Sequence, residues 1–208
     1  MIGIFGGTFD PIHFGHLRPA YEVNLALGLE ALYFVPANVP PHRPAPMASA
    51  EQRLLMVELA LTEFPQFVLD DREITRGGIS YTTDTLQSYR DQYGDKSIVL
   101  LMGADAFSGI ETWHCWQSIP ELAHIVVMQR PGWNQVNMPD WAARRTTDRI
   151  EDLRDSSAGL VYFQSVDPQP FSATAIRAAL AKGESVEGML PQPVLDFVTH
   201  NRIYAGKD

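Results

Sequence analysis

Two histidines spaced three residues apart, His13 and His16, follow a glycine pair and stand at the start of a helix-like segment. The preceding run, residues 2–5, is apolar and has the length of a buried strand, whereas residues 17–27 have the pattern of an amphipathic helix. Glycines let a ligand approach the backbone closely, and a helix N-terminus offers unpaired N–H groups and a positive dipole end. Residues 6–16 therefore predict an anion site of the kind that binds phosphate.

The histidine pair has two other interpretations. Two histidines on one helix face can ligate a metal, but a zinc site needs a third or fourth ligand, so no metal-ligating residue is predicted. A buried or capping histidine with a purely structural role is the second alternative. We favour a phosphate contact, because imidazolium donates hydrogen bonds, neutralises charge and has a pKa near neutrality. The other histidines are scattered, with no carboxylate at ligand spacing: His42, His114, His124 and His200.

Other motifs of phosphate or nucleophilic chemistry are absent from the sequence. It contains no Gly-Lys-Ser/Thr of a Walker loop and no Gly-x-Gly-x-x-Gly of a dinucleotide site. There is no Gly-x-Ser-x-Gly elbow, and Cys115 lies between bulky residues. A Walker-type nucleotidase, a dinucleotide oxidoreductase and a serine hydrolase are therefore all poorly supported.

Composition excludes several broad classes. The 208 residues include 16 basic and 25 acidic side chains, a net charge of −9, which argues against a nucleic-acid binder. A single cysteine rules out an internal disulfide and suits a reducing compartment. No run approaches the roughly 18 apolar residues of a membrane span, and the chain begins directly with the strand-like run. We expect a cytoplasmic protein that binds neither nucleic acid nor membrane.

Strand-like and helix-like segments alternate along most of the chain, which is typical of a parallel sheet with right-handed crossovers. We predict an α/β fold, a Rossmann-like doubly wound parallel sheet, in a single domain over residues 1–208 with a helical C-terminal part from about residue 172. Residues 72–80 are expected to be a loop, and residues 132–157 a variable surface region of unknown role. The strands are expected at residues 2–5, 31–36, 67–69, 97–102, 124–128 and 160–163, and the helices at 17–27, 49–63, 82–94, 173–182 and 191–201.

Two segments resemble the paired signatures of the nucleotidyltransferases with a His-x-Gly-His motif. Residues 6–16, Gly-Gly-Thr-Phe-Asp-Pro-Ile-His-Phe-Gly-His, are similar to the first signature. Residues 171–177, Phe-Ser-Ala-Thr-Ala-Ile-Arg, are similar to the second, Ser-x-Thr-x-x-Arg. Both signatures together, in this order, are specific. The resemblance implies a Rossmann-like fold of the nucleotidyltransferase type.

Within that superfamily the chain most resembles the bacterial nicotinate-nucleotide adenylyltransferases. The narrower match lies in residues 40–43 (Pro-Pro-His-Arg), residues 79–86 (Ile-Ser-Tyr-Thr-Thr-Asp-Thr-Leu) and residues 102–105 with the following loop of two tryptophans. It spans nearly the whole chain except about residues 132–157. The resemblance implies adenylyl transfer from ATP to nicotinate mononucleotide, giving nicotinate adenine dinucleotide and pyrophosphate in NAD biosynthesis.

The resemblance also implies the ATP-binding residues. His13 and His16 would hold the triphosphate and stabilise charge at the α-phosphate, and Ser172 and Arg177 would hold the β- and γ-phosphates. His16, His13 and Arg177 are thus the expected catalytic residues, although Ser172 could serve only as a helix N-cap. Mg²⁺ is expected to bind through the ATP phosphates and water. The remaining expected ATP contacts are Gly6, Gly7, Thr8, Phe9, Gly103, Asp105 (at a ribose hydroxyl) and Thr174.

The acceptor side is implied in the same way. Arg43 would meet the mononucleotide phosphate, where the family more often has lysine; a solvated loop arginine is the alternative. Thr82, Thr83 and Asp84 would place main-chain N–H groups at the nicotinate carboxylate, or simply start a helix. Either of two tryptophans would stack on the pyridine ring, or both could be core aromatics: Trp113 and Trp116.

Several alternatives remain open at this point. Pantetheine-phosphate adenylyltransferase, or another small-acceptor nucleotidyltransferase, is the nearest rival function, and a tRNA-charging enzyme is disfavoured by the short, acidic chain. A nucleotide sensor that binds without turnover is the alternative from a different class. The phosphate nucleophile needs no general base, which agrees with the lack of a base–nucleophile pair. The preference between nicotinate and nicotinamide mononucleotide and the oligomeric state are not predicted.

Overall fold

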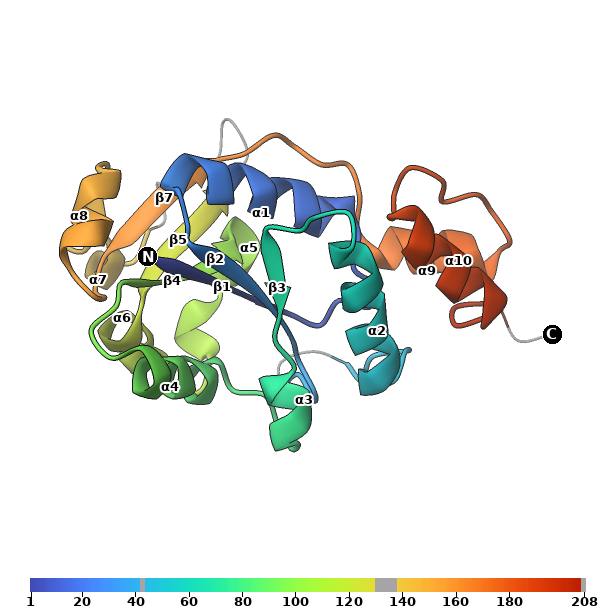
Figure 1. The fold of residues 1–208 in the computed structure, drawn as a ribbon, viewed down its shortest axis with the longest axis horizontal. Helices are drawn as coiled ribbons and strands as arrows, with labels where there is room; N and C mark the ends of the chain where they lie inside the picture. Colours follow the sequence, from blue (N-terminus) through green and yellow to red (C-terminus); the bar gives the residue numbers. More distant parts are fainter. Residues whose placement is uncertain (42–43, 130–137, 207–208) are drawn as a thin grey trace.

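A computed structural model describes residues 1–41, 44–129 and 138–206, and Figure 1 shows its arrangement. In this part of the chain one sheet of seven strands has the order β3-β2-β1-β4-β5-β7-β6, and each neighbouring pair is parallel. The strands are β1 (Ile2–Gly7), β2 (Ala31–Pro36), β3 (Phe67–Leu69), β4 (Ile98–Gly103), β5 (His124–Gln129), β6 (Thr146–Thr147) and β7 (Val161–Ser165).

Helices lie on both sides of this sheet (Figure 1). The longest, α1, begins directly after His13 and ends at Gly28, whose left-handed backbone (φ 60°) suits glycine. The helices are α1 (Phe14–Leu27), α2 (Ala50–Leu61), α3 (Arg72–Arg76), α4 (Thr82–Tyr93), α5 (Ala104–Ser108), α6 (Ile119–Leu122), α7 (Asp140–Ala143), α8 (Ile150–Asp155), α9 (Ala173–Ala181) and α10 (Gln192–His200), with short 3-10 turns at Ile110–Thr112 and Trp116–Ser118.

Two core clusters lie on opposite faces of the sheet, because successive side chains of a strand point to opposite sides. In β4, Val99 and Leu101 join the cluster that contains residues of α1, α2 and α10. Ile98, Leu100 and Met102 join the cluster that contains residues of α4, α5 and α6. Burial on both faces explains why the strands are almost continuously apolar in the sequence. The prediction of a doubly wound parallel sheet is confirmed.

The strand order changes direction between β1 and β4. The chain passes from β1 outward through β2 to β3, and then returns to place β4 on the other side of β1. In open α/β sheets this switch point forms a crevice at the carboxyl ends of the strands, where ligands bind. Gly7 ends β1, Pro36 ends β2 and Gly103 ends β4, so all three lie at that edge.

Two segments contain more regular structure than their sequences indicate. Residues 72–80, expected to be a loop, begin with the five-residue helix α3. Residues 138–157 contain α7, the two-residue strand β6 and α8. Such short elements leave too few apolar positions for a periodic pattern, and tertiary contacts hold them instead. In α8, for example, Leu153 is fully buried and Arg154 donates a hydrogen bond to the Leu27 carbonyl (2.8 Å). The first part of the expected variable region, up to residue 137, lies outside the described residues.

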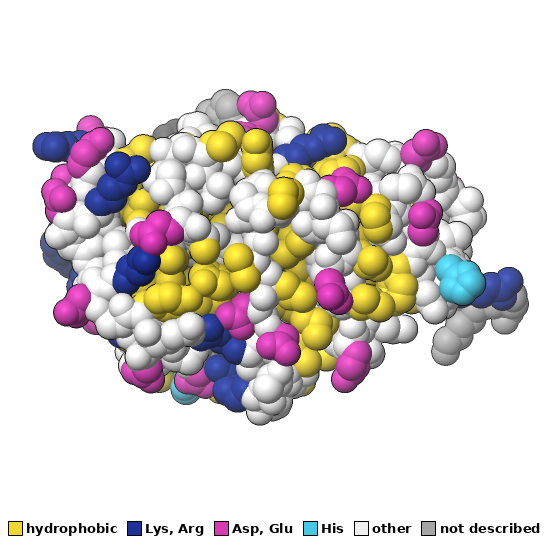
Figure 2. All heavy atoms as spheres, in the orientation of Figure 1, with side chains coloured by type: hydrophobic (Ala, Val, Ile, Leu, Met, Phe, Trp, Pro, Cys, Tyr) yellow, Lys and Arg dark blue, Asp and Glu magenta, His cyan; other side chains and the backbone are white. Residues whose placement is uncertain are grey.

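On the face shown in Figure 2, hydrophobic side chains gather across the middle, with acidic and basic side chains scattered around them. The α9–α10 pair lies at one end of the molecule beside α2 (Figure 1). None of the helices described here is long and apolar enough to cross a membrane.

Candidate active site

The loop after β1 turns sharply because Phe9 folds back beneath it. Phe9 has a left-handed backbone (φ 49°) and its ring is only 2% exposed. A Cβ on Gly7 would lie 2.7 Å from that ring, so only glycine fits above it. The ring of Phe9 meets His16 edge to face, with 5.2 Å between the ring centroids. The side chain of Phe9 therefore supports His16 from the core.

The two histidine rings lie against each other at the start of α1, tilted by 33°. Their ring centroids are 3.8 Å apart. The Nδ1 atom of His16 accepts a hydrogen bond from the backbone N–H of His13 (3.3 Å), which is one of the unpaired donors at the helix start. Because Nδ1 is an acceptor, neutral His16 carries its proton on Nε2. Nε2 of His16 is thus a hydrogen-bond donor.

The His13 side chain is buried and closely packed. Its side chain is 4% exposed, and its Nδ1 atom has no hydrogen-bond partner among the described residues. A Cβ on Gly15 would lie 2.7 Å from this ring and 3.1 Å from the Phe171 carbonyl oxygen. Burial lowers the pKa of His13 to about 4, so the ring is neutral at pH 7 before a ligand binds. Any positive charge on His13 therefore depends on an approaching anion.

The second signature is in contact with the first. The Ser172 hydroxyl accepts a hydrogen bond from the Ala175 N–H (3.2 Å) and so caps α9. Arg177 donates from Nη1 to the Asp10 carbonyl (2.7 Å) and from Nη2 to the Thr174 hydroxyl (3.5 Å). Residues 6–16 and 171–177, which are predicted from the sequence to form one site, lie together in the structure.

Asp10 lies at the centre of this junction, although the sequence analysis gives it no role. Its carboxylate accepts hydrogen bonds from the Met47 N–H (2.9 Å), the Ala48 N–H (3.1 Å) and the Tyr204 hydroxyl (2.8 Å). Its side chain is buried, and Arg177 Nη1 lies 3.9 Å from one carboxylate oxygen. Because these partners come from distant segments, spacing in the sequence gives no signal for this contact.

Arg53 of α2 is a second residue that the sequence analysis missed. It is 1% exposed, and its guanidinium donates to the carbonyl groups of Thr8 (2.9 Å), Ala37 and Asn38 (2.8 Å). It therefore ties the exit of β1 to the exit of β2. Burial lowers the pKa of Arg53. The sequence does indicate that Arg53 is buried, because it lies on the helical stripe of α2 that continues at Met56, Val57 and Ala60.

Gly103 and Asp105 reach the same edge of the sheet from β4, the neighbour of β1. Gly103 is the N-cap of α5, and Asp105 is exposed in its first turn. A Cβ on Gly103 would meet no atom within 4 Å, so the space above this strand end is open. This placement is compatible with the predicted ATP contacts of both residues.

The predicted acceptor turn, Thr82 to Asp84, is the first turn of α4. The Thr83 hydroxyl is buried and has no hydrogen-bond partner in the described part of the chain. The turn is joined to the segment after β2, because the Asn38 N–H donates to the Ser80 hydroxyl (2.9 Å) and the Ser80 N–H to the Val39 carbonyl (2.9 Å). Arg43, the predicted phosphate ligand of the acceptor, lies outside the described residues.

The tryptophan loop lies beside the same turn. His114, between the two tryptophans, packs on Tyr81, the N-cap of α4, with 4.2 Å between ring centroids. Trp113 and Trp116 are half-buried against the core cluster on this face. Trp116 also packs on Trp141 of α7 (5.2 Å between centroids). The structure thus brings the loop and the acceptor turn together.

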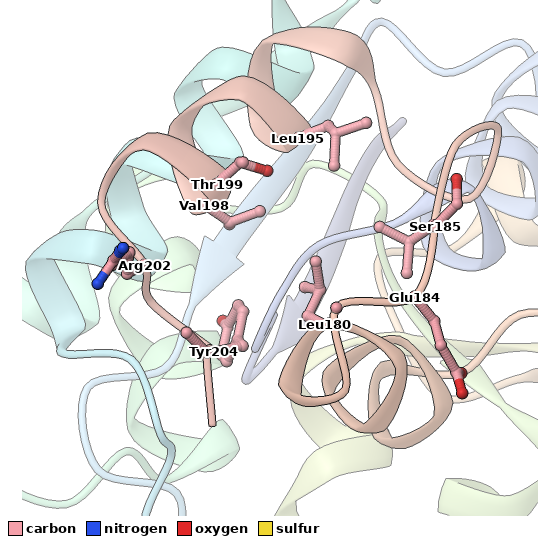
Figure 3. Close-up of a pocket in the computed structure, with 11 residues that line it drawn as sticks. Leu180, Glu184, Ser185, Leu195, Val198, Thr199, Arg202 and Tyr204 are labelled. Carbon is pink, nitrogen blue, oxygen red and sulfur yellow. The ribbon is translucent and has the colours of Figure 1, made fainter. Parts of the chain in front are cut away.

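A cleft of about 280 Å³ lies apart from these residues, at the α9–α10 end of the molecule (Figure 3). Its apolar wall includes Leu180, Val198 and Tyr204. None of the predicted site residues that the structure describes lines it. In the same described ranges, no three or more His, Cys, Asp and Glu side chains form a group that could hold a metal ion.

Comparisons with known proteins agree with this arrangement. A family model described as cytidylyltransferase-like matches residues 4–179. A protein named "Probable nicotinate-nucleotide adenylyltransferase" in Methylococcus capsulatus is 43% identical over 210 residues, which cover 99% of this chain and 100% of the relative. A protein of the same name in Aeromonas hydrophila is 42% identical over 206 residues, which cover 98% of this chain and 96% of the relative. A structure of the Plasmodium falciparum nicotinic acid mononucleotide adenylyltransferase complexed with NaAD has the same fold, with a TM-score of 0.74 at 16% identity over 98% of this chain and 96% of that one.

The fold, the paired signatures and the family match define the class of protein: the chain belongs to the cytidylyltransferase-like family of nucleotidyltransferases. Within that family, its full-length relatives place it among the nicotinate-nucleotide adenylyltransferases.

Proposed function

We propose that His16, His13 and Arg177 carry out the adenylyl transfer for which this group of enzymes is named. ATP and nicotinate mononucleotide react to give nicotinate adenine dinucleotide and pyrophosphate. The observation that supports these roles best is the hydrogen bond between Arg177 and the Asp10 carbonyl (2.7 Å), which joins the two signatures at the crevice beside β1. A donor set of this kind suits a triphosphate.

The reaction needs charge stabilisation more than proton transfer. The attacking oxygen belongs to a phosphate that is ionised at neutral pH, so no general base is required. His16 donates from Nε2 toward the α-phosphate, because its Nδ1 is occupied by the His13 N–H. Arg177 and the N-terminus of α9 hold the departing pyrophosphate. In-line positioning and stabilisation of developing charge then account for the rate.

Mg²⁺ is proposed to arrive with ATP. The donors of the described site are mainly histidine and arginine, and the Asp10 carboxylate is already occupied by three hydrogen bonds. These residues suit phosphate oxygens better than a bare cation, so the ion would be held by the ATP phosphates and water. When bound, it neutralises phosphate charge.

The acceptor is proposed to lie between the start of α4 and the tryptophan loop. The N-terminus of α4 favours the nicotinate carboxylate, and the buried Thr83 hydroxyl is available to donate to it. Trp113 is the better candidate for stacking on the pyridine ring, because Trp116 already packs on Trp141. Arg43 and Asp84 are proposed to meet the acceptor phosphate and the nicotinate group, and Asp105 a ribose hydroxyl.

An exposed, free Cys115 suits a reducing compartment, and we propose the cytoplasm.

A substrate comparison tests the function. The purified protein is incubated with ATP and Mg²⁺ and, in separate reactions, with nicotinate mononucleotide, nicotinamide mononucleotide or phosphopantetheine, and released pyrophosphate and dinucleotide are measured. We expect the highest kcat/KM with nicotinate mononucleotide. Preferred use of phosphopantetheine would assign a different acceptor. ATP binding without pyrophosphate release from any acceptor would make the protein a nucleotide sensor.

A further inference from the structure

Tyr204 makes a buried contact that none of the proposed roles uses. It is 1% exposed, and its hydroxyl donates to Asp10 Oδ1 at 2.8 Å across 194 residues of sequence. Figure 3 shows Tyr204 on the wall of the terminal cleft, between α10 and the end of α9. Burial and the neighbouring Asp10 raise the pKa of this hydroxyl, so it stays a proton donor. A phenylalanine would fill the same core space, which leaves the hydrogen bond as the distinctive contribution of tyrosine.

A strained turn aims Tyr204 inward. After α10 the chain reverses at Arg202, whose backbone is left-handed (φ 50°), a conformation that residues with a side chain rarely adopt. The turn is fixed by hydrogen bonds from the Ile203 N–H to the Val198 carbonyl (3.1 Å) and from the Ala205 N–H to the Arg202 carbonyl (3.3 Å). The fold therefore maintains an unfavourable backbone conformation at the point that delivers the hydroxyl to Asp10.

Asp10 transmits this contact to Arg177. Three donors fix the Asp10 carboxylate, and the carbonyl of the same residue accepts the Arg177 guanidinium. Loss of the Tyr204 hydroxyl leaves the Met47 and Ala48 amides in place but removes the donor on the side of the C-terminal segment. Asp10 Oδ1 is then held by the Ala48 N–H alone, so the residue whose carbonyl accepts from Arg177 is less firmly fixed.

We propose that Tyr204 is a positioning residue for adenylyl transfer, which holds Arg177 in its ATP-binding geometry through Asp10. This inference rests on the proposed role of Arg177 in binding the ATP phosphates. It concerns the ATP side, because the Met47 and Ala48 amides still anchor their segment on the Asp10 carboxylate when the Tyr204 hydroxyl is absent.

The test compares two tyrosines in matched settings. Tyr89 is also fully buried and donates to a carboxylate, Asp70 Oδ2 (2.6 Å), on the opposite face of the sheet. Tyr204→Phe and Tyr89→Phe each delete one such hydroxyl. We expect Tyr204→Phe to lower kcat/KM for ATP about three- to tenfold, the range of a typical net hydrogen-bond contribution, with the KM for nicotinate mononucleotide unchanged. Tyr89→Phe is expected to lower the thermal midpoint without changing either kinetic constant.

A double-mutant cycle with Arg177→Lys separates positioning from general destabilisation. If Tyr204 acts through Arg177, Tyr204→Phe has little further effect on kcat/KM for ATP in the Arg177→Lys background. Equal losses in both backgrounds, equal kinetic effects of the two tyrosine variants, or an unchanged kcat/KM would each overturn the proposal. Circular dichroism and thermal melting confirm that the variants fold. Absence of product from the wild-type protein would instead refute the proposed function.

Discussion

A Cβ on Gly15 would lie 2.7 Å from both Cε1 and Nδ1 of His13, closer than real Cβ contacts come. The glycine of the His-x-Gly-His motif is thus required by the packing of its first histidine. We predict that Gly15→Ala displaces the His13 ring, lowers kcat roughly tenfold or more because the site is misaligned, and costs about 1–3 kcal/mol of stability. Steady-state kinetics and urea unfolding measure the two effects. Gly109→Ala is the control, since a Cβ there would have only ordinary contacts (3.8 Å to the Ala106 carbonyl oxygen).

His16→Ala tests the predicted charge stabiliser. Removing one donor aimed at developing charge is expected to lower kcat by a factor on the order of 10²–10³, with the fold intact. His200→Ala, which removes an exposed histidine at the end of α10, is expected to leave turnover unchanged. Near-normal turnover of purified His16→Ala would show that the assigned role is wrong.

Two threonines that lie two residues apart in α4, Thr83 and Thr85, are expected to respond to substitution in opposite ways. The Thr83 hydroxyl is buried without a hydrogen-bond partner among the described residues, whereas the Thr85 hydroxyl donates to buried Glu73. Thr83→Val should therefore keep or raise stability, and raise the KM for nicotinate mononucleotide about tenfold. Thr85→Val should lower stability by about 1–3 kcal/mol. Thermal melts and acceptor kinetics on both variants check this pair, and a Thr83→Val protein with an unchanged KM would argue against an acceptor contact.

His13 also predicts a pH dependence of stability. Burial lowers its pKa from 6.5 to about 4 in the folded protein, so below pH 6.5 the unfolded chain binds a proton at this ring that the folded chain does not. The free energy of unfolding is therefore unaffected by this ring above pH 6.5, and it falls by about 3 kcal/mol in all as the pH drops from 6.5 to 4.

Urea unfolding between pH 4 and 7.5 measures this slope, and His13→Gln is expected to flatten it. Some slope should remain in the variant, because burial lowers the pKa of His124 as well. An equally steep slope in His13→Gln would mean that other groups account for the pH dependence.

The fold was largely predictable because its strands are buried on both faces. The run from Ile98 to Met102 contributes side chains to both core clusters, so it is continuously apolar and recognisable without any tertiary information. The same holds for β1, β2 and β5. By contrast β6 has two residues, paired with Val161 and Tyr162, and its position depends on that pairing rather than on its own pattern.

The arrangement of the candidate site was predictable where its residues are consecutive and not where they converge from distant segments. His13, His16, Ser172 and Arg177 lie in two short signatures, and the sequence predicts that these meet. Tyr204 reaches Asp10 across 194 residues, and no periodicity or spacing in the sequence indicates such a contact. Arg53 is intermediate, since its place in an apolar stripe indicates burial but not the three carbonyl groups that it binds.

The position of β1 in the middle of the sheet has a consequence for biosynthesis. The histidines that follow β1, His13 and His16, leave the ribosome long before Arg177 and Tyr204. A chain that stops after β7 contains every strand of the described sheet and neither of these two side chains. The two halves of the proposed ATP site therefore come together only after every strand of the described sheet has been synthesised.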